Sequence, residues 1–328
     1  MRLLNVQTLT LEEYFGASIP RYAILSHCWG AEEVTFQDVK AVPWQASNCE
    51  RLGARKITLS SEQAKKDGLS YIWIDTCCID KTSSAELSEA INSMYSWYEN
   101  ATVCYAFLED VDHMESSSKA IERDRKFEQS RWFTRGWTLQ ELIAPGDVQF
   151  YDRYWNFQGD KTELCDLLSK ITKISEGVLI DPSRRHASSV ARKMSWAAGR
   201  QTTRIEDIAY SLLGIFNVNM PLLYGEGEKA FIRLQEEILK ETDDQSLLAW
   251  GISTGKTSNV KSPSDFSQSA NVVSYPSPFG SQPYSMTNKG LQIELPLWSD
   301  SEAGSRRKIA MLNCHFENDF SSSLGVCL

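Results

Sequence analysis

The sequence predicts an α/β fold over roughly its first 150 residues, with a doubly wound parallel sheet flanked by helices. Three short runs are apolar at every position, which is typical of parallel strands covered on both faces. A strongly amphipathic helix pattern separates the second run from the third. Because strands and helices alternate in this way, we expect right-handed crossovers between the parallel strands.

The expected strands of this sheet are short and rich in β-branched and aromatic residues. They cover residues 22–25, 71–74, 103–108 and 148–151. The helix before the third strand begins at a capping box of Ser83 and Glu86, and its apolar residues recur at helical spacing: Leu87, Ala90, Ile91, Met94, Trp97 and Tyr98. A shorter helix over residues 60–68 precedes the second strand and ends at Gly68.

Residues 151–250 have a mainly helical pattern, and we expect them to form an extension packed on the sheet domain. Thr203 and Glu206 form a second capping box, which predicts a helix over residues 205–216. The turn Gly225-Glu-Gly227 opens a further helix whose apolar face holds Phe231, Leu234 and Ile238.

The composition changes again after residue 250. Residues 252–287 are rich in Ser, Pro, Asn and Gly, which is typical of a linker. Strand patterns follow over residues 290–295 and 309–314. The predicted domains are therefore residues 1–150, 151–250 and 251–328, the last a linker with a short β-rich region.

Charge and cysteine content restrict the function further. The 328 residues carry 34 basic and 43 acidic side chains, a net charge of −9, so nucleic acid and anionic membranes are poor partners. The eight cysteines form no CxxC pair, and neither a signal peptide nor an apolar segment of about 20 residues is present. We expect a cytoplasmic protein with reduced cysteines.

Polar residues gather where the predicted strands end. Residues 26–30 follow the first strand, residues 75–80 follow the second, and residues 130–142 lie beyond the third. The carboxyl ends of parallel strands share one edge of a sheet, and that edge is where open α/β sheets bind ligands. The sequence therefore predicts a polar cleft with aromatic walls.

Two carboxylates in these segments have two interpretations each. Glu141 lies four residues after Trp137, so a helix places an acid beside a stacking ring. A carboxylate beside a sugar can stabilise the oxocarbenium-like state of glycosidic bond cleavage or position water. The alternative is a capping box with Thr138, in which Glu141 only satisfies the helix start. Asp75 is a candidate ligand for a ribose or a metal, or else an acceptor for loop N–H groups.

Neighbouring residues suggest other chemistry less strongly. His27 is a candidate acid, base or phosphate contact, or a hydrogen-bonded loop residue. Cys28 and Cys78 are candidate thiol nucleophiles, but His27 and Cys28 are adjacent on a strand and point to opposite faces. Because no second cysteine pair or HxxxH accompanies Cys77 and Cys78, we predict no metal site.

Three of these segments resemble the signature blocks of the fungal heterokaryon-incompatibility (HET) domain. They are Tyr22-Ala-Ile-Leu-Ser-His-Cys-Trp-Gly30, Trp73-Ile-Asp-Thr-Cys-Cys-Ile-Asp80 and Arg135-Gly-Trp-Thr-Leu-Gln-Glu141, in the same order and at similar separations. Residues 194–200 and 223–227 resemble the helical region that often follows this domain. The resemblance implies fungal non-self recognition that leads to growth arrest or cell death, a form of innate immunity.

HET domains are in turn remotely similar to TIR domains, which implies a flavodoxin-like sheet and, as in several TIR domains, hydrolysis of NAD⁺. The catalytic Glu of plant TIR domains lies in a Trp-Cys-Leu-x-Glu-Leu block, which Trp137-Thr-Leu-Gln-Glu-Leu142 resembles with Thr138 in place of Cys. Glu141 then becomes the expected catalytic residue. By position, the resemblance also implies a set of substrate-binding residues: Ser26, His27, Trp29, Gly30, Asp75, Arg135 and Trp137.

The expected partners follow from the same resemblance. NAD⁺ is the substrate and no further cofactor is implied. TIR-like enzymes complete their site by self-association, so we expect self-association on activation and an upstream sensor protein. The alternative is a non-enzymatic signalling module that acts by self-association and recruitment, and a third reading is a thiol hydrolase that uses Cys28 or Cys78.

Overall fold

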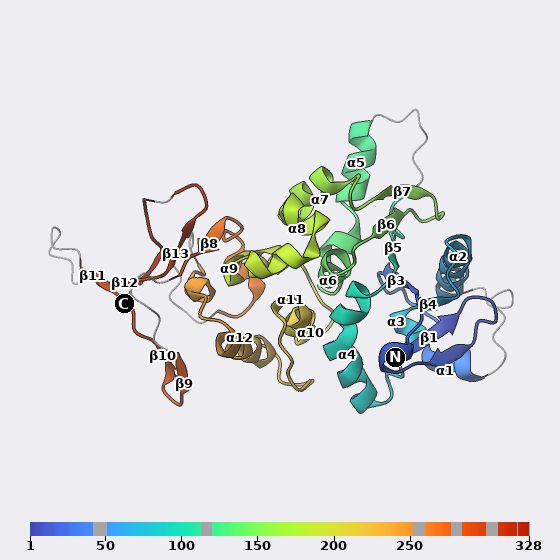
Figure 1. The fold of residues 1–328 in the computed structure, drawn as a ribbon, viewed down its shortest axis with the longest axis horizontal. Coiled ribbons are helices and arrows are strands. Elements are labelled where there is room, and N and C mark those ends of the chain that lie inside the picture. Colours follow the sequence, from blue (N-terminus) through green and yellow to red (C-terminus); the bar gives the residue numbers. More distant parts are fainter. Residues whose placement is uncertain are drawn as a thin grey trace. The chain divides into compact units, whose positions relative to one another are not determined.

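The computed structural model describes residues 1–41, 51–112, 120–251, 260–276, 284–299, 308–319 and 321–327 (Figure 1). The chain forms two compact units, Met1–Pro182 and Ser183–Leu328. The Ser/Pro-rich segment predicted as a linker lies partly outside the described residues. Among those described, no helix is both long enough and apolar enough to cross a membrane.

The first unit contains a seven-stranded sheet with the order β2-β1-β4-β3-β5-β6-β7. Its strands are β1 (Arg2–Asn5), β2 (Leu11–Glu13), β3 (Ala23–His27), β4 (Tyr71–Trp73), β5 (Val103–Phe107), β6 (Val148–Tyr151) and β7 (Phe157–Asp160). The four central strands, β4-β3-β5-β6, are parallel, and the pairs at both edges are antiparallel. When the four parallel strands are numbered by their order in the chain, they lie side by side in the sheet in the order 2-1-3-4.

The four central strands are those that the sequence predicts, and this part of the prediction is confirmed. Every residue of β3 and β5 is buried, as their apolar runs require, and the burial includes the polar residues Ser26 and His27 at the end of β3. Strands β1, β2 and β7 were not predicted. Each has only three or four residues, too few to show a period, and β1 and β7 are fixed by antiparallel pairing with β4 and β6.

Helices α2 (Leu52–Lys66) and α4 (Ser84–Glu99) cover opposite faces of this sheet (Figure 1). The predicted start of α4 is confirmed, since the Ser83 side chain accepts the Glu86 N–H. The reciprocal half of that capping box is wrong, because the Glu86 carboxylate instead accepts the Asp80 N–H and pairs with Arg2. Helix α2 begins at Leu52, well before the predicted residue 60. The prediction missed its first turns because they carry Gly53 and Lys56 where an apolar stripe would be expected.

The remaining helices of the first unit are short. They are 3₁₀ turns at Gly16–Ser18 and Arg131–Thr134, with α1 (Phe36–Ala41), α3 (Asp75–Cys78), α5 (Ala120–Glu128), α6 (Thr138–Ile143), α7 (Cys165–Thr172) and α8 (Glu176–Ile180). Large aromatic side chains fill the core between helices and sheet: Trp73, Tyr98, Tyr105, Trp132 and Phe150. Helix α3 follows β4 directly, whereas α6 lies between β5 and β6 in the chain and its Glu141 carbonyl lies 3.9 Å from Sγ of Cys104 on β5.

The second unit begins with helices. They are 3₁₀ turns at Pro182–Ala187, Gln245–Leu248 and Pro263–Phe266, with α9 (Val190–Ala197), α10 (Asp207–Tyr210), α11 (Leu213–Phe216) and α12 (Lys229–Glu241). Helix α12 and its buried face are confirmed. The single helix predicted over residues 205–216 is instead the pair α10 and α11, and Glu206 accepts the N–H groups of Gly225 and Gly227.

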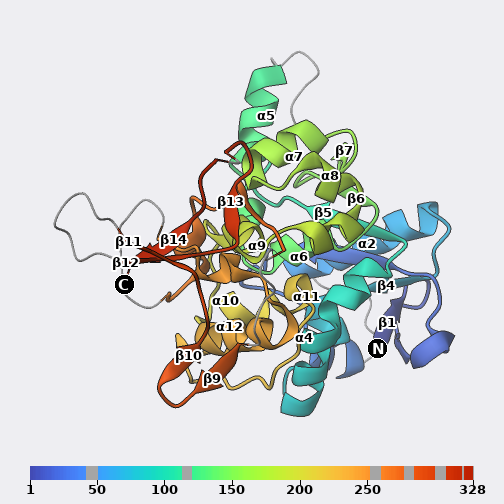
Figure 2. The same cartoon turned by 60° about the vertical axis from the view of Figure 1, so that its left-hand side comes forward.

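Small antiparallel sheets complete the second unit. The pairs are β8 (Val272–Ser274) with β13 (Cys314–Phe316) and the hairpin of β9 (Ser285–Thr287) and β10 (Gly290–Gln292), visible in Figure 2. A three-stranded sheet joins β11 (Leu297–Ser299), β12 (Lys308–Met311) and β14 (Gly325–Cys327). The predicted β-rich C-terminal region is confirmed, although its strands are shorter than the sequence pattern suggests.

Candidate functional site

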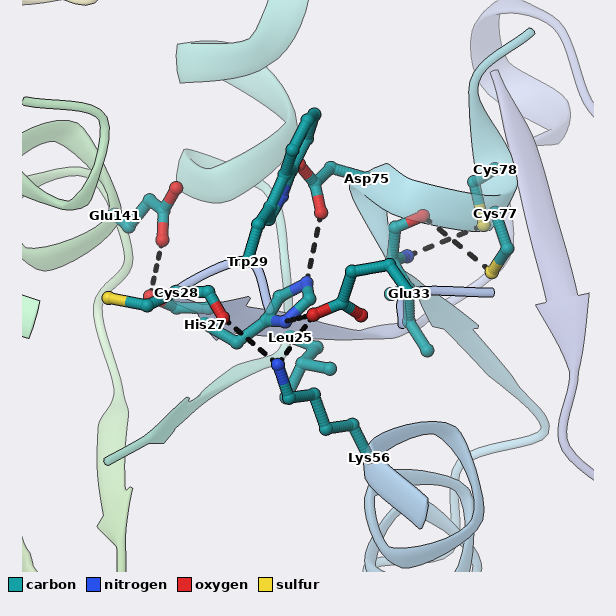
Figure 3. Close-up of polar contacts among 12 residues, drawn as sticks. Leu25, His27, Cys28, Trp29, Glu33, Lys56, Asp75, Cys77, Cys78 and Glu141 are labelled. Carbon is teal, nitrogen blue, oxygen red and sulfur yellow. Dashed lines mark hydrogen bonds and ion pairs between the residues drawn. The ribbon is translucent and has the colours of Figure 1, made fainter. Parts of the chain in front are cut away.

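The polar segments that follow the parallel strands meet at one edge of the sheet, as predicted. Ser26 and His27 are the last residues of β3, Asp75 begins α3 directly after β4, and Glu141 lies on α6. Alternation along β3 sends Ser26 and His27 to opposite faces, so each side chain belongs to a different cluster. In the view of Figure 3, the Trp29 ring stands between the carboxylates of Glu141 and Asp75.

The first cluster connects Glu141 to the core. The Ser26 hydroxyl donates to Oε2 of Glu141 and accepts a hydrogen bond from Nε1 of Trp132 at 2.8 Å. Because the indole N–H can only donate, the serine proton is directed at the carboxylate, which acts as the acceptor. Ser26 is fully buried and Glu141 is 7% exposed, so this orientation is fixed at the strand end.

Two observations bear on the capping interpretation of Glu141. The N-cap position of α6 is Trp137, which makes no side-chain capping bond. The Thr138 hydroxyl donates toward the carbonyl oxygens of Trp132 and Arg135. Whatever its capping role at the start of α6, the Glu141 carboxylate also accepts the hydroxyl of Ser26 on β3.

Tyr98 on α4 lies near the same carboxylate. Its hydroxyl donates to the carbonyl of Leu25 at 3.2 Å. Burial, and then the charge of Glu141, raise the pKa of Tyr98 well above its ordinary value. The phenol is therefore neutral at physiological pH and adds no charge that would compete with Glu141.

The second cluster orders the exposed ring of Trp29. Asp75 accepts the Trp29 indole N–H at 2.8 Å through Oδ2 and contacts Nε2 of His27 at 3.1 Å through Oδ1. Burial opposes the charge of Asp75, but Lys81 and the bonds from His27 and Trp29 outweigh it and lower the pKa of Asp75. Asp75 is thus an ionised anchor with both oxygens engaged, and its role as a ribose ligand stays a prediction.

A buried ion pair holds the loop between these residues. The Lys56 ammonium, 3% exposed, lies 2.6 Å from Oε1 of Glu33 and 2.9 Å from the Cys28 carbonyl oxygen. The same Glu33 oxygen accepts the Gly30 N–H at 2.7 Å. Helix α2 also approaches the loop closely at Gly53, where an added Cβ would lie 2.6 Å from the Glu32 carbonyl oxygen.

The thiols at this edge are poorly suited to nucleophilic catalysis. Burial raises the pKa of Cys28 to about 11, although the charge of Arg131 lowers it in part. Cys77 and Cys78 are buried, with their sulfur atoms near the backbone of Ile74. The described residues hold no group of three or more His, Cys, Asp or Glu side chains arranged for a metal ion.

The remaining predicted residues lie around these clusters. Gly30 uses its N–H to bind Glu33. Arg135 is half-buried, and its positive charge acts to lower the pKa of the Cys28 thiol. Trp137 is half-buried at the start of α6. The structure therefore joins Ser26 with Glu141, and it joins His27 and Trp29 with Asp75.

Several residues of the site were missed in the sequence. Trp132 lies inside the predicted segment 130–142, but nothing in the local pattern sets it apart from the other aromatic residues. Lys56 carried a signal, because it stands among the small residues Gly53, Ala54 and Ser60 on the buried side of α2. Glu33 and Lys81 lie in polar loops where charge is ordinary.

Comparison with known proteins decides the family. The sequence profile of the heterokaryon-incompatibility protein family (HET) matches residues 22–126. The chain is also 46% identical over 233 residues to the vegetative incompatibility protein HET-E-1 of Podospora anserina. This chain is a HET-domain protein.

The extent of each match limits what it covers. The match to HET-E-1 covers 69% of this chain and only 17% of that relative. The matched HET segment includes Ser26, Trp29 and Asp75, whereas Glu141 lies beyond its end. A domain of unknown function, DUF8212, matches residues 229–292 in the second unit. Solved structures offer no significant match.

Proposed function

We propose that this HET-domain protein acts in fungal non-self recognition and that its first unit hydrolyses the N-glycosidic bond of NAD⁺. The likeness to a vegetative incompatibility protein supports the biological role. The observation that carries the chemistry is the contact between Glu141 and Ser26 at the carboxyl end of the parallel strands.

The sheet topology supports this placement. The order 2-1-3-4 is the one with which flavodoxin-like sheets begin, and such sheets bind ligands between their first and third strands. Those strands correspond to β3 and β5, which pair at Ser26 and Ala106. Ser26 and Glu141 therefore lie at the switch point where a nucleotide is expected, which also favours the TIR-like resemblance.

The carboxylate suits the reaction. When the bond between ribose and nicotinamide breaks, the electron pair leaves with the nicotinamide nitrogen, which becomes neutral. Positive charge then develops on the ribose, and an adjacent carboxylate stabilises such an oxocarbenium-like state. Water adds to the ribose carbon and loses a proton. Glu141 supplies the negative charge, while Ser26 and Trp132 fix its position.

The test is nicotinamide release from NAD⁺ by the full chain at high concentration or artificially clustered. Glu141→Gln keeps the size of the side chain and removes its charge, so we expect a loss of at least about a hundredfold. Glu89→Gln, an exposed change on α4, is the matched control and should release nicotinamide at the wild-type rate.

Equal release by wild type and Glu141→Gln would contradict the proposed role, provided that circular dichroism shows both to be folded. If none of the proteins releases nicotinamide and Glu141→Gln still triggers cell death in the fungus, the protein is a non-enzymatic signalling module.

A further inference from the structure

The exposed ring of Trp29 already carries a cation. Nζ of Lys81 lies 3.5 Å from the centroid of the indole ring. Within the described part of the chain, this ammonium makes no hydrogen bond or salt bridge, so the ring face is its direct contact. A cation centred over an indole is attracted by the negative face of the ring, and tryptophan is the strongest such partner.

The ring keeps its orientation without help from Lys81. Its N–H is bonded to Asp75, and Asp75 is held in turn by His27. Trp29 remains 51% exposed although its edge is anchored. An exposed aromatic side chain fixed by a buried polar network is a preorganised surface, because its rotamer entropy is already lost.

The surrounding charge favours a positive ligand. Asp75 is ionised and bonded to the N–H edge of the ring, whereas the nearby charge of Glu33 is already paired with Lys56. The chain segment that carries Lys81 is itself fixed, since Asp80 accepts both the N–H and the hydroxyl of Thr82. The long lysine side chain can therefore swing away while its backbone stays in place.

We propose that Trp29 is a binding platform for a planar organic cation and that Lys81 is an internal occupant which the ligand displaces. This inference rests on the proposed function in one respect: the cationic nicotinamide ring of NAD⁺ is the ligand of this class that the site would meet. Trp29 then binds the positive charge of the nicotinamide ring, and hydrolysis removes that charge. The neutral nicotinamide product therefore binds Trp29 more weakly than the cationic ring of NAD⁺ does.

The experiment measures binding and needs no turnover. The probe is 1-methylnicotinamide, a planar cation without a scissile ribose bond, and neutral nicotinamide is its comparison ligand. Titration is followed through the ¹⁵N-labelled indole signals of the full chain, and the Trp29 signal is assigned from Trp29→Phe.

We expect the cation to shift the Trp29 signal at lower concentration than nicotinamide does. Lys81→Gln should tighten binding of the cation by about two- to fivefold, the range of an exposed cation–π contact. Lys40→Gln is the matched control, because Lys40 is also an exposed lysine over an aromatic ring, at 5.5 Å from the Phe36 centroid. It should leave the affinity unchanged.

Three results would overturn the proposal: equal affinity for the two ligands, unchanged or weaker cation binding in Lys81→Gln, or full cation binding in a folded Trp29→Leu variant. These results are independent of the hydrolysis assay. Nicotinamide release that depends on Glu141, without cation binding at Trp29, leaves the proposed function intact and rejects the platform. Cation binding at Trp29 without nicotinamide release supports the platform and rejects the proposed hydrolysis.

Discussion

Replacement of Lys56 by Met tests whether one buried ion pair holds the loop of the candidate site. The ammonium is 2.6 Å from Glu33, and Coulomb's law gives about 6 kcal/mol for that distance at an effective dielectric constant of about 20. Desolvation of both charges cancels much of this attraction. The cost of the substitution therefore comes mainly from the Glu33 charge that is left without its partner.

Removing one member of a buried pair costs about 3–5 kcal/mol. The lower end applies here, because Glu33 keeps the Gly30 N–H and its side chain is 12% exposed. About 3 kcal/mol corresponds to roughly a hundredfold change in the equilibrium between the closed and open loop. Hydrogen exchange followed by mass spectrometry should show that the Gly30 and Gly53 amides lose protection to that extent.

Two further variants decide the cause. Lys65→Met alters an exposed lysine of the same helix and should leave the exchange unchanged. The double variant Lys56→Met/Glu33→Gln removes both charges of the 2.6 Å pair and should recover most of the protection. Glu109, which lies 3.6 Å from the same ammonium, keeps its charge, but its side chain is 30% exposed and is solvated by water. Two results would refute the role of this ion pair. One is wild-type hydrogen exchange in Lys56→Met, and the other is a double variant whose loss of protection equals the sum of the losses in Lys56→Met and Glu33→Gln.

Three other predictions concern neighbouring residues. With the pKa of Cys28 raised to about 11 by burial, iodoacetamide should modify native Cys28 far more slowly at pH 7.5 than the exposed Cys327; similar rates in mass spectra would contradict its buried state. The lowered pKa of Asp75 means that its charge stabilises the folded protein above about pH 4, and that this stabilisation is lost as the pH falls through the folded-state pKa. Asp75→Asn should therefore lower the urea midpoint at pH 7 but not near pH 2. Trp132→Phe leaves the Ser26 hydroxyl without its donor and should cost about 1–3 kcal/mol in thermal unfolding, together with part of any nicotinamide release; unchanged values of both would remove Trp132 from the site.

The sequence by itself predicted the central elements of this protein. An unbroken apolar run of four to six residues has few solutions other than a strand buried on both faces, so β3 and β5 were predicted to within two residues at each end. Ser83 as an N-cap and the amphipathic period located α4 for the same kind of local reason. The motifs then placed Ser26, Asp75 and Glu141 at the ends of strands and helices.

Only the tertiary structure decided which of these residues meet. Ser26 and Glu141 are 115 residues apart in the chain, and strand order alone brings them together. The small residues around Lys56 indicate a buried position on α2, but only the tertiary structure shows that its partner is Glu33. Local periodicity encodes what a segment becomes, whereas charge pairing and stacking depend on which surfaces pack together, and that is fixed by the pairing of strands distant in the chain.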